Sequence, residues 1–201
     1  MATADLPQSI PYQPLRVSVE RYHDLIRAGA FSEHDEVELL DGVVTEKMSK
    51  NPRHALATRK IDLALSKLIV HLVPEAWHVR NQEPVTILNS EPEPDIAIVR
   101  GKLDDYANRH PGVGEIDLVI EVADTSLVTD RYKAGIYAAA EIPTYWLVNL
   151  SDGTIEVYDS PVSGGEASRY AGSQVYAEDG TLPVSVAGIE IGHISVRNLL
   201  P

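Results

Sequence analysis

A carboxylate and a lysine occupy positions that the hydrophobic pattern predicts to be buried. Glu121 follows the apolar run 116–120, which is typical of a strand covered on both faces. Lys133, twelve positions later, shares the apolar face of a predicted helix with Ile136 and Tyr137. Because burying a charge is costly unless the charge is paired, the two residues indicate a shared chemical task.

A second acid, Asp95, comes first in a predicted strand, directly after Pro94. If this strand is a neighbour of the one that carries Glu121, the two carboxylates converge at the sheet edge. They then repel each other unless a cation lies between them, and oxygen ligands favour Mg²⁺ or Mn²⁺. With an ammonium nearby to orient or deprotonate water, this is the chemistry of metal-assisted phosphodiester hydrolysis.

Each of these residues also has a structural alternative. Asp95 could be a turn residue, Glu121 could form a structural ion pair, and Lys133 could extend its amine into solvent. His54 lies near the start of a helix predicted from Asn51-Pro52. It is either a histidine at the edge of the core or a proton carrier or phosphate contact at the positive end of that helix.

Composition narrows the classes of function. The chain has 201 residues, 44% of them hydrophobic, a formal net charge of −13 and no cysteine, so thiolate metal sites and cysteine nucleophiles are excluded. It has no Walker A, GxGxxG, HExxH or GxSxG motif. The acidic balance counts against a nonspecific nucleic-acid coat protein, but not against an enzyme that meets phosphates through bound cations. Without a long apolar run or a signal-peptide pattern, the expectation is a cytoplasmic protein that is not in a membrane.

The elements that must position these residues form a mixed α/β pattern. Residues 1–14 are expected to form an extended arm, and residues 15–201 a single domain with helices packed on a mixed sheet. The predicted helices cover about residues 18–29, 52–71 and 129–140. The predicted strands are a hairpin around Asp41-Gly42, 77–82, 85–88, 94–99, 116–121, 145–150, 155–158 and two short strands in the tail, while residues 161–180 are weakly patterned.

Several stretches together resemble a known family. Pro94-Asp95 followed by Glu121 is similar to the PD-(D/E)xK nucleases, the restriction-endonuclease-like superfamily. From about residue 15 to the end, the chain resembles the Uma-two family of bacterial restriction endonucleases. The matching pieces are LRVSVERYHDLIRAG, VELLDGVV, a helix opening Pro52-Arg53-His54, PDIAIVRG, LVIEVADTS, residues 130–133, AAAEIPTYWLVNL and LPVSVAGIEIGHISV.

The resemblance implies an α/β restriction-endonuclease-like fold with a β-rich C-terminal extension. It also implies a Mg²⁺- or Mn²⁺-dependent endonuclease that acts on nucleic acid, with DNA the first expectation, and a homodimer. Asp95 and Glu121 become metal-binding carboxylates. Glu38 becomes an additional acid of the catalytic site, which with them holds the metal ion or its water shell. The superfamily pattern places its lysine where this chain has Ala123. The resemblance to members whose lysine lies on the following helix assigns the catalytic role to Lys133.

Gln82 and His54 are further candidates, as substrate-binding residues at the rim of the site. Residues 123–126 replace a Ser-Pro-Ser stretch that is usual in the family, which alters the turn before the helix. Two alternatives remain open at this point. One is a catalytically inactive binding or assembly protein with the nuclease fold, and the other is a metal-dependent hydrolase of a small phosphoester.

Overall fold

The computed structural model describes residues 14–32, 34–47, 50–72, 76–164 and 167–201. The helices are α1 (Val19–Arg27), α2 (Pro52–Leu72) and α3 (Leu127–Ala139), with short 3-10 helices η1 (Leu103–Tyr106) and η2 (Val196–Asn198). The strands are β1 (Val37–Leu40), β2 (Val43–Glu46), β3 (Trp77–Asn81), β4 (Ile96–Arg100), β5 (Ile116–Ala123), β6 (Thr144–Asn149), β7 (Thr154–Val162), β8 (Arg169–Tyr176), β9 (Thr181–Val186) and β10 (Ile189–Ser195). The arm expected for residues 1–14 lies, apart from Pro14, outside the described residues, and a single domain over residues 15–201 stays a prediction.

Six strands form the central sheet, in the order β3-β4-β5-β6-β7-β8. All neighbours are antiparallel except β5 and β6, which run parallel and are connected through α3. A helical crossover is the usual connection between parallel neighbours, because the chain must return to the end of the sheet at which the first strand began. The predicted mixed sheet flanked by helices is confirmed, and β9 and β10 form the predicted C-terminal strands as a separate hairpin.

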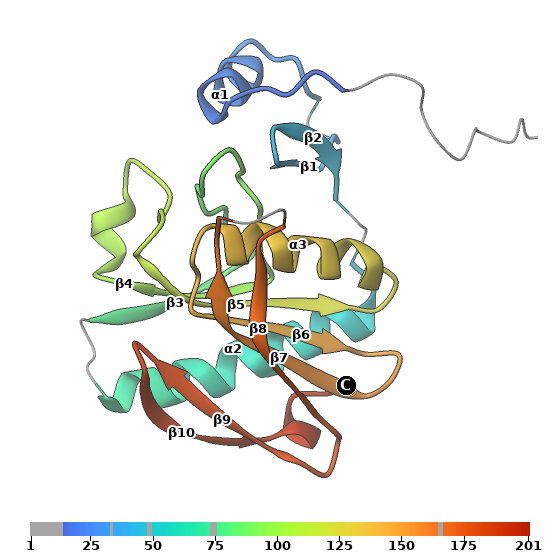
Figure 1. The fold of residues 1–201 in the computed structure, drawn as a ribbon, viewed down its shortest axis with the longest axis vertical. Coiled ribbons are helices and arrows are strands. Elements are labelled where there is room, and N and C mark those ends of the chain that lie inside the picture. Colours follow the sequence, from blue (N-terminus) through green and yellow to red (C-terminus); the bar gives the residue numbers. More distant parts are fainter. Residues whose placement is uncertain (1–13, 33, 48–49, 73–75, 165–166) are drawn as a thin grey trace, which may run out of the picture.

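The two faces of the central sheet are covered by different elements. Helix α2 and the β9–β10 hairpin cover one face, and α3 covers the other (Figure 1). Strand β5 is buried along its whole length. Because successive side chains of a strand point to opposite faces, Ile120 packs on the α2 side while Val119 and Ala123 pack on the α3 side. Glu121, in step with Val119 and Ala123, therefore faces α3.

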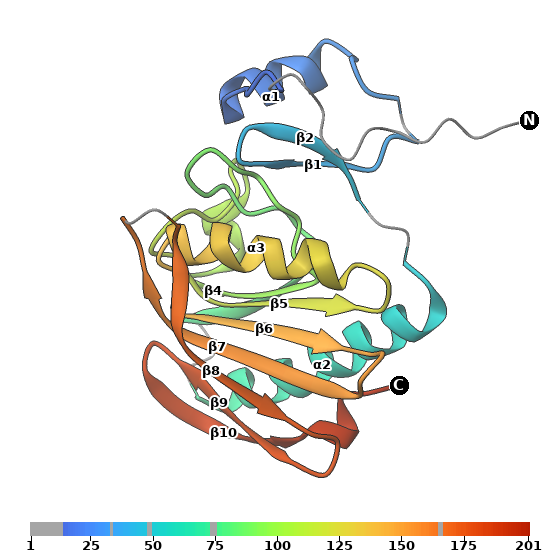
Figure 2. The same cartoon turned by 45° about the vertical axis from the view of Figure 1, so that its right-hand side comes forward.

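A smaller unit is formed by α1 and the β1–β2 hairpin. Val19 and Tyr22 of α1 pack against Leu39 of β1 in a hydrophobic cluster of their own. Figure 2 shows this unit on the α3 side of the molecule, above α3 and the loops that precede β5. The backbone of Leu39 bridges to Glu91, which attaches the hairpin to the main body. As a result, β1 carries its residues toward the α3 face of the central sheet.

Two parts of the sequence-based prediction differ from the structure. The strand predicted for residues 85–88 is wrong, because Val85 and Thr86 donate their backbone N–H groups to the Pro92 and Pro111 carbonyls of neighbouring loops. The apolar pattern there reflects burial of loop residues in the core below α3. Strand β8 is absent from the prediction because it lies at the sheet edge, where most of its side chains are exposed and carry little apolar periodicity.

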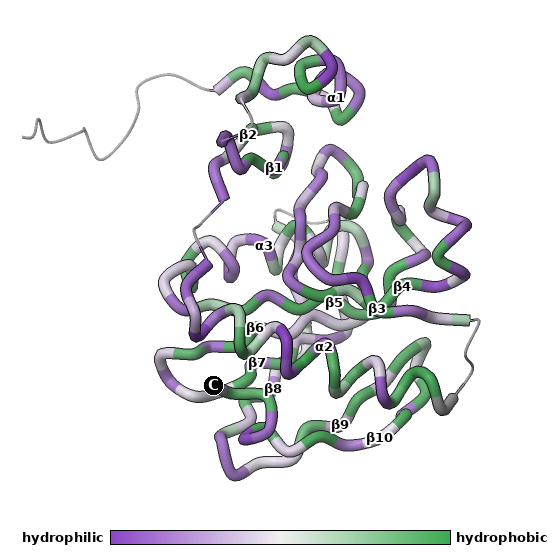
Figure 3. The backbone as a smooth tube through the Cα atoms, turned by 180° about the vertical axis from the view of Figure 1, so that it is seen from behind, coloured by the Kyte–Doolittle hydropathy of each residue, from purple (hydrophilic) through white to green (hydrophobic). Residues whose placement is uncertain are grey.

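Hydropathy along the backbone follows the layers. Figure 3 shows apolar stretches in the strands of the sheet and in the β9–β10 hairpin, and hydrophilic stretches in the surface loops. In α2 the apolar positions are interrupted by charged residues such as Arg59 and Lys67. Among the described residues, no helix is both long enough and apolar enough to cross a membrane.

Candidate active site

Asp95 meets Glu121 of β5 from the position directly before β4, so the prediction that Asp95 is the first residue of a strand is wrong by one residue. Ile96, the first residue of β4, pairs with Ile120 in antiparallel register, so Asp95 and Glu121, which flank this pair, lie side by side at the start of β4. The Val122 N–H donates to Oδ2 of Asp95 at 2.9 Å. Asp95 lies in a bend, but its side chain is buried and contacts both His54 and the Val122 N–H, so it is more than a simple turn residue.

His54 reaches the same carboxylate from the first turn of α2. Its Nε2 lies 2.9 Å from Oδ2 of Asp95, and because a carboxylate only accepts, Nε2 donates. Asn51 caps the helix by accepting from the His54 N–H at 3.0 Å, as Asn-Pro at a helix start predicts. The cap therefore positions the histidine, and the histidine binds Asp95 in the site.

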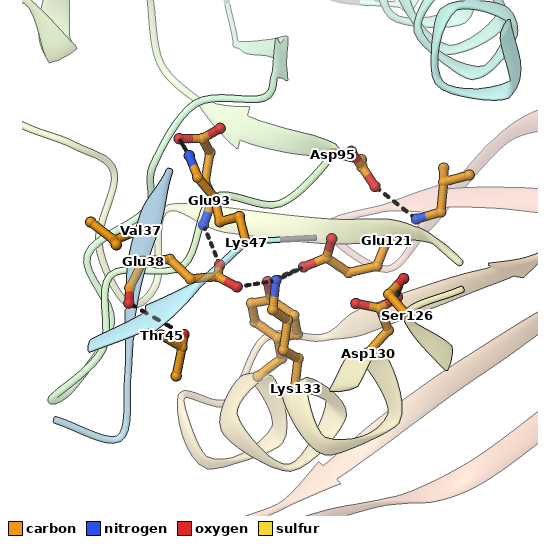
Figure 4. A network of polar contacts seen from close by, with 12 residues as sticks. Val37, Glu38, Thr45, Lys47, Glu93, Asp95, Glu121, Ser126, Asp130 and Lys133 are labelled. Atoms are coloured by element: carbon orange, nitrogen blue, oxygen red, sulfur yellow. Dashed lines mark hydrogen bonds and ion pairs between the residues drawn. The ribbon is translucent and has the colours of Figure 1, made fainter. Parts of the chain in front are cut away.

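Lys133 connects Glu121 to the hairpin. Its Nζ lies 2.8 Å from Oε1 of Glu38 and 3.2 Å from Oε1 of Glu121 (Figure 4). The three side chains are 7%, 4% and 5% exposed, respectively, so the alternative in which the amine extends into solvent does not hold. The structural ion pair considered for Glu121 does exist, and its partner is Lys133 itself. Ala123, where the superfamily has its lysine, packs in the core below α3.

Burial and the closeness of several acids change the pKa values of Glu121 and Lys133. Burial raises the pKa of Glu121 to about 8, in spite of Lys133 and with the further effect of Asp130, Asp95 and Glu38. Burial acts to lower the pKa of Lys133, but Glu121 and Glu38 outweigh it and leave that pKa above its ordinary value. Lys133 is therefore a charged ammonium, suited to orient a group or oppose negative charge. The raised pKa of Glu121 comes first from its burial, and the neighbouring acids add to the effect.

Tyr137 and Asp130 belong to the same cluster but were not candidates from sequence. The Tyr137 hydroxyl donates to Oε1 of Glu121 at 2.8 Å, and its side chain is fully buried. Asp130 is also buried, accepts from the hydroxyl of Ser126, and has its pKa raised by that burial. The available signal was spacing, because the two residues lie at i−3 and i+4 from Lys133 on one face of α3.

The cluster lines a pocket in which acids outnumber cations. The acidic lining residues are Glu38, Glu46, Glu93, Asp95, Glu121, Asp124 and Asp130, and the lysines are Lys47, Lys50 and Lys133. Lys47 pairs with Glu93 at 2.8 Å, and Arg53 of α2 pairs with Asp124 at 3.2 Å. The pocket therefore attracts cations, and a phosphate would enter it favourably only together with one.

Gln82 reaches the site through Asp95. Its backbone N–H donates to the Asp95 carbonyl at 3.0 Å, and its amide Nε2 lies 3.4 Å from Oδ1 of the same residue. It is not among the residues that line the pocket, whereas His54 is. Of the two rim candidates, His54 lines the pocket, whereas Gln82 contacts Asp95 without lining it.

The donor set has the chemistry that a hard divalent cation prefers, because it consists of carboxylate oxygens. Both oxygens of Glu38 have partners, since Oε1 contacts Lys133 and Oε2 accepts from the Glu93 N–H at 3.2 Å. Among the described residues, Asp95 and Glu121 each keep an oxygen with no hydrogen-bond or ion-pair partner nearer than 3.4 Å. Over the described ranges, no three metal-ligating side chains are grouped so that they could hold an ion. The residues thus fit a cation held by two carboxylates and water.

Comparisons with known proteins identify the family and the fold of the chain. The model of a family described as "Putative restriction endonuclease", Uma2, matches residues 19–195. The chain belongs to the Uma2 family. This is the Uma-two family whose motifs were noted in the sequence, so that prediction is confirmed.

A solved structure supports the fold of this Uma2 chain. A crystal structure from Anabaena variabilis, described as a putative nuclease belonging to DUF820, matches with a TM-score of 0.63 and 16% identity. The match covers 92% of this chain and 97% of that one. At this identity the likeness shows the fold, and the predicted nuclease-like α/β architecture is confirmed. The comparison with curated proteins gave no match.

Proposed function

We propose that this Uma2 chain is a Mg²⁺- or Mn²⁺-dependent endonuclease that hydrolyses phosphodiester bonds of nucleic acid, with DNA as its substrate. One observation carries the proposal: the ammonium of Lys133 is buried between Glu38 and Glu121, beside Asp95, in an acidic pocket. Membership of a restriction-endonuclease family supports nucleic acid as the substrate class. The homodimer implied by the resemblance stays part of this proposal.

In this proposal the residues have distinct roles. Asp95 and Glu121 would hold the cation and Glu38 its water shell, and the bound cation would supply positive charge at the scissile phosphate and acidity to the attacking water. Lys133, kept charged by its two acids, would orient that water and oppose the negative charge that develops on phosphorus. His54 would hold Asp95 through the 2.9 Å contact to Oδ2.

Cleavage assays with matched variants test the proposal. Asp95→Asn and Lys133→Met are expected to lower metal-dependent cleavage of DNA by about 10²-fold or more, the loss typical of a missing transition-state contact. Asp117→Asn is the control, because Asp117 is a buried acid of β5 that pairs with Arg100 outside the pocket. Absence of cleavage of every DNA and RNA form by the folded wild-type protein, with either metal, would overturn the proposal.

A non-catalytic binding or assembly role is the second candidate. It is favoured by the lack, within the described part of the chain, of a group of three side chains that could hold a metal ion. It predicts no heat of binding in calorimetry with millimolar Mg²⁺ or Mn²⁺. Saturable binding of either ion that is lost in Asp95→Asn would exclude it.

Hydrolysis of a small phosphoester is favoured by a different observation. Around the pocket, Lys47 and Arg53 are engaged by Glu93 and Asp124, so the mouth offers little net positive charge to a polyanionic strand. A small monoester or diester would need no such surface. Comparing turnover of small phosphoesters with turnover of duplex and single-stranded DNA separates the two activities.

A further inference from the structure

One oxygen of Glu121 receives two donors. The ammonium of Lys133 lies 3.2 Å from Oε1, and the hydroxyl of Tyr137 lies 2.8 Å from the same atom. In the part of the chain that the structure describes, no hydrogen bond or ion pair reaches Oε2. Figure 4 shows the second oxygen of Glu121 pointing away from Lys133. The carboxylate is therefore held by one atom, with the other left for a ligand.

The Tyr137 hydroxyl is held in place by the packing of its ring. Tyr137 is fully buried, and its ring centroid lies 5.2 Å from that of Tyr145. The ring of Tyr145 in turn stacks with Tyr158 at 5.8 Å and with Tyr170 at 6.3 Å. Aromatic rings packed in this way have few alternative rotamers, because a close-packed interior leaves no space for them. The hydroxyl is thus a rigid donor to a fixed point.

The partner of this hydroxyl distinguishes Tyr137 from Tyr145 and Tyr170, whereas Tyr158 of the same cluster donates to the carboxylate of Glu156, outside the pocket. Tyr145 and Tyr170 donate to the backbone carbonyls of Asp130 and Ile142, which are structural hydrogen bonds between elements. Tyr137 donates instead to a side-chain carboxylate that Lys133 already neutralises in part. Lys133 supplies positive charge to Oε1 of Glu121, and the tyrosine adds an uncharged donor to the same atom from a fixed direction.

We infer that Tyr137 is a positioning residue of the site: it fixes Oε1 of Glu121 and directs Oε2 into the pocket to bind a divalent cation. The identity of the ligand as a cation rests on the proposed function, but the orientation of Glu121 does not. Without the hydroxyl, the carboxylate is free to rotate and to present both oxygens to Lys133. Groups that orient metal ligands typically change metal affinity by about 10- to 100-fold when they are removed.

Crystal structures test the orientation without any metal. In Tyr137→Phe, which keeps the packed ring, the Glu121 carboxylate is expected to rotate so that Oε2 approaches Lys133. In the control Tyr170→Phe, which removes a hydroxyl from the same aromatic cluster outside the pocket, Glu121 is expected to keep its wild-type position. An unchanged Glu121 in Tyr137→Phe would overturn the inference, whatever the protein's activity.

Calorimetry with Mn²⁺ tests whether Tyr137 affects the affinity of the site for a divalent cation. Tyr137→Phe is expected to bind Mn²⁺ at least about 10-fold more weakly than the wild type, and Tyr170→Phe within about twofold of it. Thermal unfolding of both variants separates this effect from a loss of stability. Wild-type affinity in Tyr137→Phe would overturn the inference and leave the proposed function standing. Absence of Mn²⁺ binding by the wild type would overturn the proposed function, and the crystal structures alone would then decide the role of Tyr137.

Discussion

At the scale of single residues, Lys133 is the side chain on which the cluster depends. It is the cation placed between Glu38 of the hairpin and Glu121 of the central sheet. Two buried carboxylates that face each other are unfavourable unless positive charge separates them. The same lysine therefore contributes both to stability and to the proposed chemistry.

Lys133→Met is expected to lower the free energy of unfolding by about 3–5 kcal/mol, because it leaves Glu38 and Glu121 buried without their cation. Urea unfolding in the presence of a chelator measures this change. The control is Lys60→Met, whose ammonium on α2 contacts the Leu200 carbonyl away from the pocket, with an expected loss below about 1 kcal/mol. Equal losses in the two variants would mean that Lys133 does not hold the acids together.

At the scale of elements, the β1–β2 hairpin determines where Glu38 lies. The tight turn at Asp41-Gly42 has positive φ at both residues, 49° and 77°, which matches the Asp-Gly hairpin signal of the sequence. A Cβ at Gly42 would overlap the side-chain amide of Asn89 and come within 2.9 Å of the Val17 carbonyl. The turn thus packs against two other segments, and its conformation depends on glycine.

Gly42→Ala is expected to reduce the free energy of unfolding by about 2–3 kcal/mol, through the positive φ and the overlap together. Gly114→Ala is the matched control, because Gly114 has a φ of +82° but no atom of a described residue other than its chain neighbours within 4 Å of the position that a Cβ would take. It is expected to cost only about 1 kcal/mol. Chemical denaturation of both variants gives the comparison, and a control loss as large as that of Gly42→Ala would show that the contacts of the turn do not matter.

At the scale of the whole molecule, the negative charge of the protein repels the proposed substrate, which is a polyanion. The chain carries a formal net charge of −13, and the pocket that would receive a phosphate is acidic as well. Lys47, Lys50 and Arg53 stand at the start of α2 and the segment before it, and each has an acidic partner. Nucleic-acid binding by this molecule is therefore expected to depend on divalent cations more than on a basic surface.

The salt dependence of DNA binding follows from this charge distribution. Among the described residues, Lys47, Lys50 and Arg53 are the three cations at the mouth. A plot of log affinity against log salt is therefore expected to have a slope no steeper than about −3, and a chelator should weaken binding further. Fluorescence anisotropy with a labelled duplex measures both effects. Arg53→Gln should make the slope shallower by about 1, unlike Arg59→Gln, which alters an exposed pair outside the pocket. A steeper wild-type slope would mean that DNA contacts a basic surface away from the pocket mouth.

Much of the fold was predictable because its signals are local. The second helix was predicted for residues 52–71 and spans Pro52–Leu72, and Asn51 forms the expected capping hydrogen bond. The strand before Glu121 is buried throughout, as its apolar run indicates. Strand β8 was missed because its extended conformation is stabilised by pairing with β7. No local pattern in residues 161–180 encodes that pairing.

The sequence by itself determined the residue types of the candidate site: acids at strand ends, a lysine on an apolar helix face and a histidine behind a helix cap. Only the tertiary structure decided their partners. It placed Lys133 between Glu38 and Glu121, and His54 in contact with Asp95. It also showed that Gln82 contacts Asp95 without lining the pocket, and that the Tyr137 hydroxyl donates to Glu121. The physical reason is that these contacts join separate elements, so their distances depend on how a helix, a hairpin and a sheet pack together and not on spacing along the chain.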